Sequence, residues 1–293
     1  MSLVTRDSQP ELDLLFVLAH PDDESFGFAG LMAWAQTLEL RIGLVCATRG
    51  EAGRISDPSL GTPATLGAVR ERELRAAMSM VGVSQVRLLS YRDSGMAGTP
   101  ENQEPRSLVQ ASHEAVLADI VFQIRDLRPH AVITFGPDGV YKHPDHVRIG
   151  EIATRAVEVA ASAAYPFLGE SWPINRLYHA AVAREDLMAM SEQTSGPFVG
   201  TPPEAIATMG VPRSEITHVF DVSDFIDLKL RVIAAHATQL PFNPGDGPIG
   251  DPAMRSRLGR ESLKRIPLAW SDEDKSHDVL DVYNTLGEHR THR

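Results

Sequence analysis

The sequence has little of what would indicate a secreted or membrane-bound protein. It contains one cysteine, Cys46, which cannot form an internal disulfide and lies in the apolar run Ile42–Ala47, where we expect it to pack as a small hydrophobic side chain. No run of about 18 or more apolar residues occurs, and the first ten residues lack the basic-then-apolar plan of a signal peptide. We therefore expect a cytoplasmic protein with no membrane partner.

Basic residues are also fewer than acidic ones. Lysine and arginine number 28 against 39 aspartates and glutamates, which gives a formal net charge of −11. This balance argues against sequence-independent binding of nucleic acid or of anionic lipid, so we expect no nucleic-acid partner. The apolar share of 43% is that of a folded globular protein long enough for one large domain or two ordinary ones.

Apolar runs and helical patterns alternate along the chain, which predicts an α/β fold. Each short apolar run of a buried strand is followed by apolar residues at helical spacing, so we expect a Rossmann-like, mostly parallel sheet with helices on both faces. The predicted strands are Leu14–Leu18, Ile42–Ala47, Val86–Ser90, Ala131–Phe135, Leu177–Ala183 and Val219–Val222, and the first helix is expected to begin near Gly27.

The composition changes after Gln239, where Asn243–Pro248 reads as a loop and the rest of the tail is charged. We therefore expect one domain over residues 1–240, and a loop-rich C-terminal extension over residues 241–293 that packs on the same domain. Nothing in the sequence fixes the oligomeric state, and a homo-oligomer is compatible with it.

The first predicted strand is not followed by a glycine-rich phosphate-binding loop. Neither G-x-G-x-x-G nor G-x-x-x-x-G-K-[ST] stands there; the loop Ala19–Glu24, which reads Ala-His-Pro-Asp-Asp-Glu, stands there instead. A second cluster, His143-Pro144-Asp145-His146, follows the predicted strand Ala131–Phe135. Because ligands bind beyond the carboxyl ends of parallel strands, we expect the two loops to share one metal site.

Each loop alone has an ordinary structural explanation. A histidine after a buried strand is often a hydrogen-bonded core residue, and Asp22 or Asp23 could simply cap a helix. Two adjacent carboxylates at a buried strand end repel each other without a cation, however, so the occurrence of both loops favours metal.

The two loops together resemble the signature of the LmbE-like or PIG-L-like deacetylases, zinc hydrolases that remove acetyl from N-acetylglucosaminyl compounds. The segments Arg92–Thr99 and Ala235–Gln239 also resemble the actinobacterial mycothiol-pathway members, and the resemblance covers residues 13 to 240. It implies that zinc, or alternatively Fe²⁺, is held by His20, Asp23 and His146.

The resemblance also implies the remaining roles. Asp22 would be the general base, and a protonated His143 would stabilise the oxyanion or act as the acid, oriented by Asp145. Tyr141 would donate to the same oxyanion. Arg70 and Asp93 would hold substrate hydroxyls, although Arg70 could equally lie on a solvated helix face as a partner of Glu73, and Asp93 could simply close a turn. His236 is read as structural.

The substrate is expected to be a small amino-sugar conjugate, such as N-acetylglucosaminyl inositol or N-acetylglucosaminyl malate. Lys142, Arg49 and Arg54 keep the acidic malate conjugate open. A mycothiol S-conjugate amidase and a metal-dependent hydratase of a dicarboxylic acid are alternatives on the same scaffold, and a non-enzymatic sugar-binding protein is the least favoured.

Overall fold

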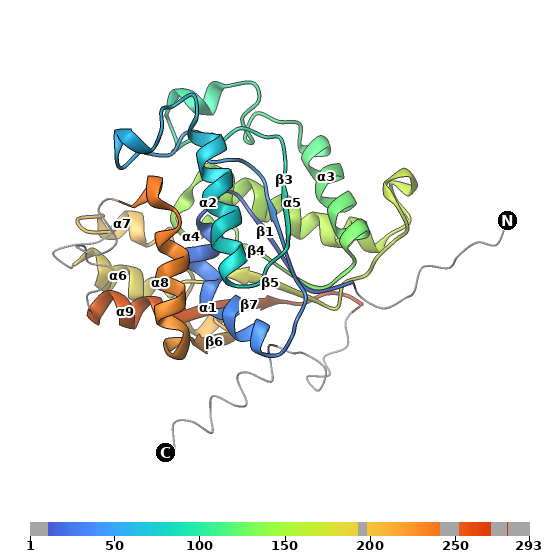
Figure 1. The fold of residues 1–293 in the computed structure, drawn as a ribbon. Coiled ribbons are helices and arrows are strands. Elements are labelled where there is room, and N and C mark those ends of the chain that lie inside the picture. The colour runs from blue at the N-terminus through green and yellow to red at the C-terminus, as the bar shows by residue number, and fades with distance from the viewer. Residues whose placement is uncertain (1–10, 193–197, 241–251, 271–279, 281–293) are drawn as a thin grey trace, which may run out of the picture.

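A computed structural model describes residues 11–192, 198–240, 252–270 and 280, and its core is a seven-stranded sheet (Figure 1). The strand order is β3-β2-β1-β4-β5-β7-β6, in which β1 to β5 are parallel and β7 runs antiparallel to both β5 and β6. The strands are β1 Leu12–Leu18, β2 Ile42–Cys46, β3 Gln85–Leu88, β4 Pro129–Phe135, β5 Arg176–Ala180, β6 His218–Asp221 and β7 Arg260–Ile266. The predicted mostly parallel sheet is confirmed.

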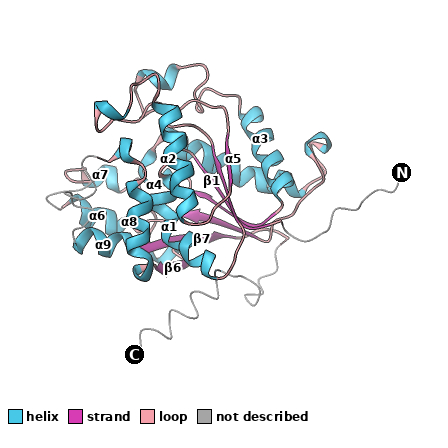
Figure 2. Ribbon diagram, viewed as in Figure 1, coloured by secondary structure: helices cyan, strands magenta, loops and turns pink. Residues whose placement is uncertain are grey.

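Helices cover both faces of the sheet (Figure 2). The crossovers through α1 and α2 lead one way along the sheet and those through α3 and α5 lead the other way, so right-handed connections place the two pairs on opposite faces. Helix α8 packs against α1 and α2, and α3 packs against α5. The helices are α1 Asp23–Thr37, α2 Leu66–Met80, α3 His113–Leu127, α4 Gly139–Lys142, α5 Pro144–Ala161, α6 Arg184–Ser191, α7 Pro203–Ile206, α8 Ile226–Ala234 and α9 Pro252–Leu258.

The chain reverses its direction across the sheet between β1 and β4. These two strands are neighbours, and apart from His130 in β4 and Asp13 in β1 their side chains are buried. A crevice forms where crossovers leave neighbouring strands in opposite directions, and this is where open α/β sheets bind ligands. The loops after β1 and β4 are the two that the sequence singled out, so the topology brings them together.

The C-terminal segment differs from the expected loop-rich extension. Its described part contains α9 and the strand β7, which lies inside the sheet between β5 and β6. Its apolar pattern is weak because one of its two buried positions holds Glu261 and the other Leu263, so the strand resembles a charged tail. The boundary at residue 240 stays a prediction, since residues 241–251, with the predicted loop Asn243–Pro248, lie outside the described residues.

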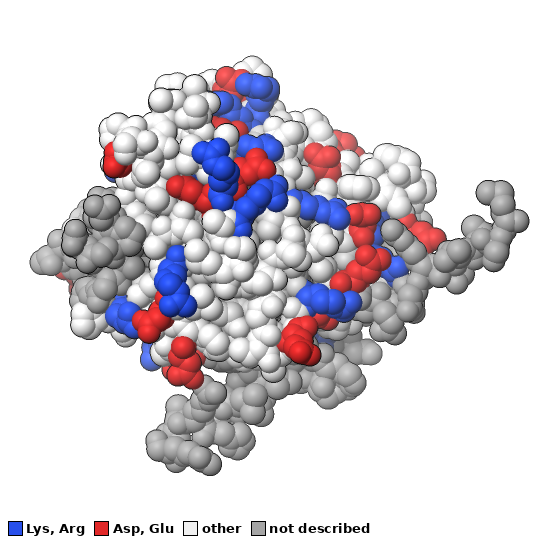
Figure 3. Space-filling model, in the orientation of Figure 1, with Lys and Arg blue, Asp and Glu red and all other residues white. Residues whose placement is uncertain are grey.

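Smaller differences concern element ends. Helix α1 begins at Asp23 instead of near Gly27, and β5 ends at Ala180 instead of Ala183. No helix in the described part of the chain is both long and apolar enough to cross a bilayer. On the face drawn in Figure 3, basic and acidic side chains lie beside one another. Among the described residues, Glu71 forms ion pairs with both Arg49 and Arg75.

Candidate metal centre and active site

The first loop turns sharply between β1 and α1. Asp22 occupies the N-cap position of α1 with φ 117°, a left-handed conformation that is uncommon for a residue with a side chain. The Oδ2 atom of Asp23 accepts hydrogen bonds from the backbone N–H groups of His20 (2.8 Å) and Ala19 (3.2 Å). These bonds fix the Asp23 carboxylate and leave its Oδ1 atom directed at the second loop.

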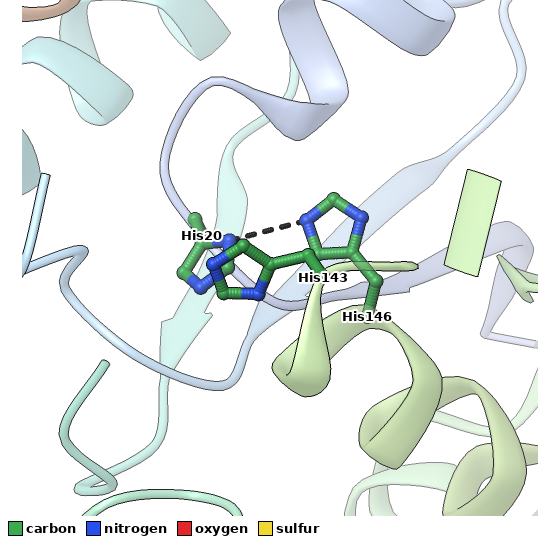
Figure 4. Close-up of side chains that lie close together, drawn as sticks. All are labelled: His20, His143 and His146. Carbon is green, nitrogen blue, oxygen red and sulfur yellow. Dashed lines mark hydrogen bonds between the residues drawn. The ribbon is translucent and has the colours of Figure 1, made fainter. Parts of the chain in front are cut away.

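The second loop ends in the N-terminus of α5. His143 is the N-cap residue, and its Nδ1 atom accepts a hydrogen bond from the backbone N–H of Asp145 at 3.2 Å, while Pro144 takes the first helical position. His146 follows in the first helical turn and points back at the first loop, and its ring stacks on Phe135 at 4.0 Å. The loop therefore presents two imidazoles from one helix start (Figure 4).

Three predicted ligands converge where the loops meet. His20 Nδ1 lies 3.2 Å from His146 Nε2 (Figure 4). Asp23 reaches both rings with different oxygen atoms: its Oδ1 lies 3.1 Å from His146 Nε2, and its Oδ2 lies 3.7 Å from His20 Nδ1. Ligands bound tetrahedrally at about 2.0–2.1 Å from a metal lie about 3.3–3.4 Å from one another. The distances between these pairs of atoms lie close to that value, so the three residues fit a divalent ion.

The remaining hydrogen bonds of the two histidines direct Nδ1 of His20 and Nε2 of His146 at each other, and these two nitrogens share a hydrogen bond at 3.2 Å. His20 Nε2 donates to Asp145 Oδ2 at 3.1 Å and lies 3.4 Å from Asp93 Oδ1, so Nδ1 is the nitrogen that would face a metal. His146 Nδ1 donates to the carbonyl oxygen of Gly139 at 3.2 Å, so its lone pair is on Nε2. Metal-bound histidines usually donate their other N–H in this way. His20 also takes part in two compact clusters of potential ligands, one with His143 and His146 and one with Asp93 and Asp145.

Charge and burial set the pKa values around this centre. Burial acts to lower the pKa of His20, but the carboxylates of Asp93, Asp145 and Asp23 raise it well above its usual range. Burial acts to raise the pKa of Asp23, but the imidazoles of His146 and His20 outweigh it and lower that pKa. The group of carboxylates around His20 and His146 therefore favours positive charge at this position, which a metal cation supplies.

Asp22 differs from Asp23 in its environment. Burial raises the pKa of Asp22 to about 6, against the opposing charge of Arg70 and with the help of the Asp23 carboxylate. Its Oδ2 atom lies 3.0 Å from Nη2 of Arg70, and its side chain remains 21% exposed. Asp22 lines a cavity together with Asp23, Tyr141 and His146. A carboxyl group with a pKa near neutral pH and access to such a cavity can accept a proton from a neighbouring water molecule.

Arg70 does not lie on a solvated helix face. It is 3% exposed, and it donates to the carbonyl oxygens of Gly50 (2.8 Å) and Pro21 (2.5 Å) as well as to Asp22. A Cβ atom at Gly50 or Gly53 would lie within 2.5 Å of the guanidinium, so both glycines make room for it. The expected pairing with Glu73 is replaced by these contacts.

Asp93 is also engaged by the protein. Its Oδ1 accepts the backbone N–H of Gly95 at 2.8 Å and its Oδ2 that of Ala52 at 3.2 Å, in addition to the contact with His20. The turn that it closes therefore also places a carboxylate beside a predicted metal ligand.

Asp145 contacts a different histidine from the expected one. Its carboxylate is fully buried, receives the backbone N–H and the hydroxyl of Ser94, and accepts from His20 instead of orienting His143. The N-terminal turn of α5 directs the side chain of Asp145 inward under His20, while only its backbone N–H reaches the ring of His143.

His143 is not favoured in the protonated form that we expected. Burial lowers its pKa to about 4, and positive charge on His20 and His146 lowers it further, against Asp145 and Asp93. Because Nδ1 accepts the N–H of Asp145, a neutral ring carries its proton on Nε2 and can donate it. Burial raises the pKa of Tyr141 above its usual range, so its hydroxyl also remains a donor.

Sequence reasoning missed three contributors to the site. Gly139 supplies the carbonyl that orients His146, Ser94 holds Asp145, and Glu24 accepts the backbone N–H of Asp22 at 3.0 Å. Glu24 stands in the first loop and Ser94 beside Asp93, so their positions were available, but their contacts depend on the fold.

The chain is similar to known proteins in sequence and in fold. A family model described as PIG-L, GlcNAc-PI de-N-acetylase, matches residues 15–157. A protein of Rhodococcus jostii is named 1D-myo-inositol 2-acetamido-2-deoxy-alpha-D-glucopyranoside deacetylase. It is 36% identical over an aligned length of 292 residues, and the alignment covers 94% of this chain and 99% of the relative. The protein of the same name from Rhodococcus erythropolis is 39% identical over 241 residues, which cover 79% of this chain and 82% of the relative. A solved N,N'-diacetylchitobiose deacetylase from Pyrococcus horikoshii shares the fold with a TM-score of 0.62 at 21% identity, over 87% of this chain and 84% of the other.

Proposed function

Since this chain belongs to the PIG-L family of de-N-acetylases, we propose that it removes the acetyl group from a low-molecular-weight N-acetylglucosaminyl conjugate by metal-assisted hydrolysis. The chain is a hydrolase of N-acetyl amide bonds, as its relatives are. The observation that carries the proposal is the meeting of three predicted ligands at His146 Nε2, which lies 3.2 Å from His20 Nδ1 and 3.1 Å from Asp23 Oδ1. Asp22 lines the same cavity as Asp23 and His146.

His20, Asp23 and His146 would hold the metal. A divalent ion bound by these atoms supplies positive charge that polarises the acetyl carbonyl and lowers the pKa of a water molecule to about 7. Two imidazoles and one carboxylate accept Zn²⁺ and also Fe²⁺, and we propose zinc as the first ion to test.

Asp22 is the general base of the proposed reaction. It accepts the proton of the attacking water and passes it to the departing amine, which leaves as the free amino group of glucosamine. Arg70 holds the Asp22 carboxylate at 3.0 Å and favours its ionised form. Arg70 thereby keeps the Asp22 carboxylate beside the proposed metal ligands while Asp22 itself does not bind the metal.

His143 and Tyr141 stabilise the developing negative charge. The Nε2–H of neutral His143 and the hydroxyl of Tyr141 are the donors, and the two rings lie edge to face with centroids 6.1 Å apart. Donors fixed by the protein before the reaction are worth about 2.7–4 kcal/mol each toward an oxyanion.

Arg70 and Asp93 support the site through the contacts already described. Direct contact of these two side chains with substrate hydroxyls stays a prediction. Asp145 acts through His20: it accepts the hydrogen bond of Nε2–H and so keeps Nδ1 directed at His146.

The substrate we propose is N-acetylglucosaminyl inositol. The relatives at 36% and 39% identity carry names that specify this compound. The acidic malate conjugate is less favoured, because these names do not specify it and because Arg49, one of the cations that kept it open, already pairs with Glu71 at 2.9 Å. The same names speak against the S-conjugate amidase and hydratase alternatives.

The test is release of acetate and of a primary amine by the zinc-loaded protein. The compounds are N-acetylglucosaminyl inositol, N-acetylglucosaminyl malate and free N-acetylglucosamine, with Asp22→Asn as the matched variant. We expect turnover of the inositol conjugate, and a loss of about 10²- to 10⁴-fold in kcat for Asp22→Asn with one zinc per chain retained. Zinc-loaded protein that releases no acetate from any of the three would refute the proposal.

A further inference from the structure

A buried charged cluster lies behind the loop that carries Asp22. Glu24 in the first turn of α1 and His236, which follows α8, are both 0% exposed. The Nε2 atom of His236 lies 2.9 Å from Glu24 Oε1 and 2.9 Å from the hydroxyl of Ser25, which itself donates to Glu24 Oε1 at 2.5 Å. Glu24 and His236 are 212 residues apart in the chain, so the fold brings them together.

The other oxygen of Glu24 is bound to the backbone of the general base. Glu24 Oε2 accepts the N–H of Asp22 at 3.0 Å. Asp22 has φ 117°, a strained conformation that a residue with a side chain keeps only where its surroundings hold it there. The bond from Glu24 is therefore one of the restraints that keep Asp22 in this conformation.

The second restraint acts on the other end of Asp22. Arg70 of α2 binds the Asp22 carboxylate and the carbonyl oxygen of Pro21. Three residues further along α2, Glu73 accepts the backbone N–H of Thr238 at 2.8 Å and its hydroxyl at 2.7 Å. The segment that carries His236 is therefore tied to the helix that carries Arg70.

That segment is fixed on its far side as well. Ser56 donates from its backbone N–H to Thr238 O at 2.9 Å and from its hydroxyl to Ala237 O at 2.8 Å. Among the described residues, Nδ1 of His236 has no hydrogen-bond partner, so the ring makes its polar contacts through Nε2, toward Glu24 and Ser25.

We propose that Glu24 and His236 are positioning residues that hold the backbone of Asp22 in its strained conformation, and so keep its carboxylate aligned with the attacking water. The proposal rests on the proposed role of Asp22 as general base. If Glu24 and His236 only stabilised the core, the Oε2 atom of Glu24 would not need to bind the N–H of Asp22.

The test measures kcat, KM, zinc content and the free energy of unfolding for Glu24→Ala, Glu24→Gln, His236→Ala and the double alanine variant. We expect each single alanine variant to lower kcat by about 10- to 100-fold, because a misplacement of about 1 Å has effects of this size. KM should stay within about twofold and zinc at one per chain. Glu24→Gln should recover most of kcat, because its amide oxygen can still accept the N–H of Asp22.

The double variant should lose no more kcat than Glu24→Ala alone, because both side chains act through one link. The control is Val232→Ala, which truncates a fully buried side chain of α8 outside this cluster. It should lower the free energy of unfolding but leave kcat unchanged. A crystal structure of Glu24→Ala should show Asp22 with φ relaxed to a negative value.

Losses of kcat that follow stability in the same way as Val232→Ala, or losses that add in the double variant, would overturn the proposal. If Glu24→Ala does not fold, His236→Ala decides the matter by the same measurements. A wild-type protein without acetate release would refute the proposed function instead, and the φ of Asp22 in the Glu24→Ala crystal would still show whether Glu24 holds that residue.

Discussion

Replacing Gly139 by alanine should weaken metal binding although Gly139 is not a ligand. Gly139 has φ +57°, and its carbonyl oxygen accepts the Nδ1–H of His146. A Cβ atom at this position would lie 2.9 Å from the Cβ of His146 and 2.9 Å from the backbone nitrogen of Val147. Neither neighbour is the end of a flexible side chain, so the start of α5 has to move.

The size of the effect follows from these distances. The contacts must lengthen by about 0.5 Å to reach ordinary van der Waals separation, whereas metal–ligand distances tolerate only about ±0.2 Å. Disturbing the group that orients a ligand lowers metal affinity by about 10- to 100-fold, which corresponds to about 1.4–2.7 kcal/mol. Alanine in a left-handed conformation adds a loss of about 1 kcal/mol in the free energy of unfolding.

Zinc affinity is measured by competition with a chromogenic chelator, and stability by urea unfolding of the metal-free protein. The matched control is Gly98→Ala, because Gly98 has φ +86° but nothing within 4 Å of an added Cβ. The control should lose about 1 kcal/mol of stability at unchanged zinc affinity. Gly139→Ala protein with wild-type zinc affinity would refute the argument that the backbone around Gly139 sets the position of His146.

Three further predictions concern protonation, a buried ion pair and backbone strain. Burial raises the pKa of Asp22 to about 6, and a bound cation would lower it again. We therefore expect kcat/KM to fall tenfold per pH unit on acidification, but only below about pH 6. A fall that already begins above pH 7 would exclude Asp22 as the base. Lys229→Ala leaves the buried Glu261 without its partner at 2.6 Å and should lower the free energy of unfolding in urea by about 3–5 kcal/mol, whereas Arg255→Ala, which breaks an exposed pair with Asp227, should lower it by less than about 1 kcal/mol. Val140→Gly should leave the free energy of unfolding within about 1 kcal/mol of the wild type, because relief of the strain at φ 66° and ψ −55° offsets the lost packing of a side chain that contacts the core. The same variant should lower kcat by loosening Tyr141, and a loss of more than about 2 kcal/mol in the free energy of unfolding would show that the turn is not strained.

The sheet and the meeting of the two loops could be predicted from the sequence because both depend on local pattern and topology. Apolar runs located five parallel strands within a few residues of their ends, and parallel strands place their carboxyl ends at one edge. His20, Asp23 and His146 then had to lie near one another once β1 and β4 were neighbours.

Contacts inside the site could not be predicted, because they depend on where each side chain points. A shift of one residue along a helix or turn changes that direction. Asp145 lies two positions from His143 in the chain, yet its carboxylate reaches His20. The burial of Arg70 depends on two glycines that leave room for its guanidinium, and nothing in the helix pattern around Arg70 shows this. The strand β7 could not be recognised in the sequence because a glutamate, Glu261, stands at a buried position. Glu261 is accommodated there because it accepts hydrogen bonds from Lys229 and from two backbone N–H groups of α1.

Backbone strain occurs in both loops of the predicted site. Three of the six non-glycine residues with positive φ in the described part of the chain lie there: Asp22 directly before Asp23, and Val140 and Lys142 shortly before His143 and His146. Each such residue is strained by about 1–3 kcal/mol, so the loops keep these conformations only while their neighbours hold them. The neighbours differ: Glu24 and Arg70 hold Asp22, while the carbonyl oxygen of Val140 is held by the N–H of Gly210 at 3.3 Å. Arg70 and Gly210 lie far along the chain from the turns that they hold, so these turns depend on contacts that the two loop motifs do not contain.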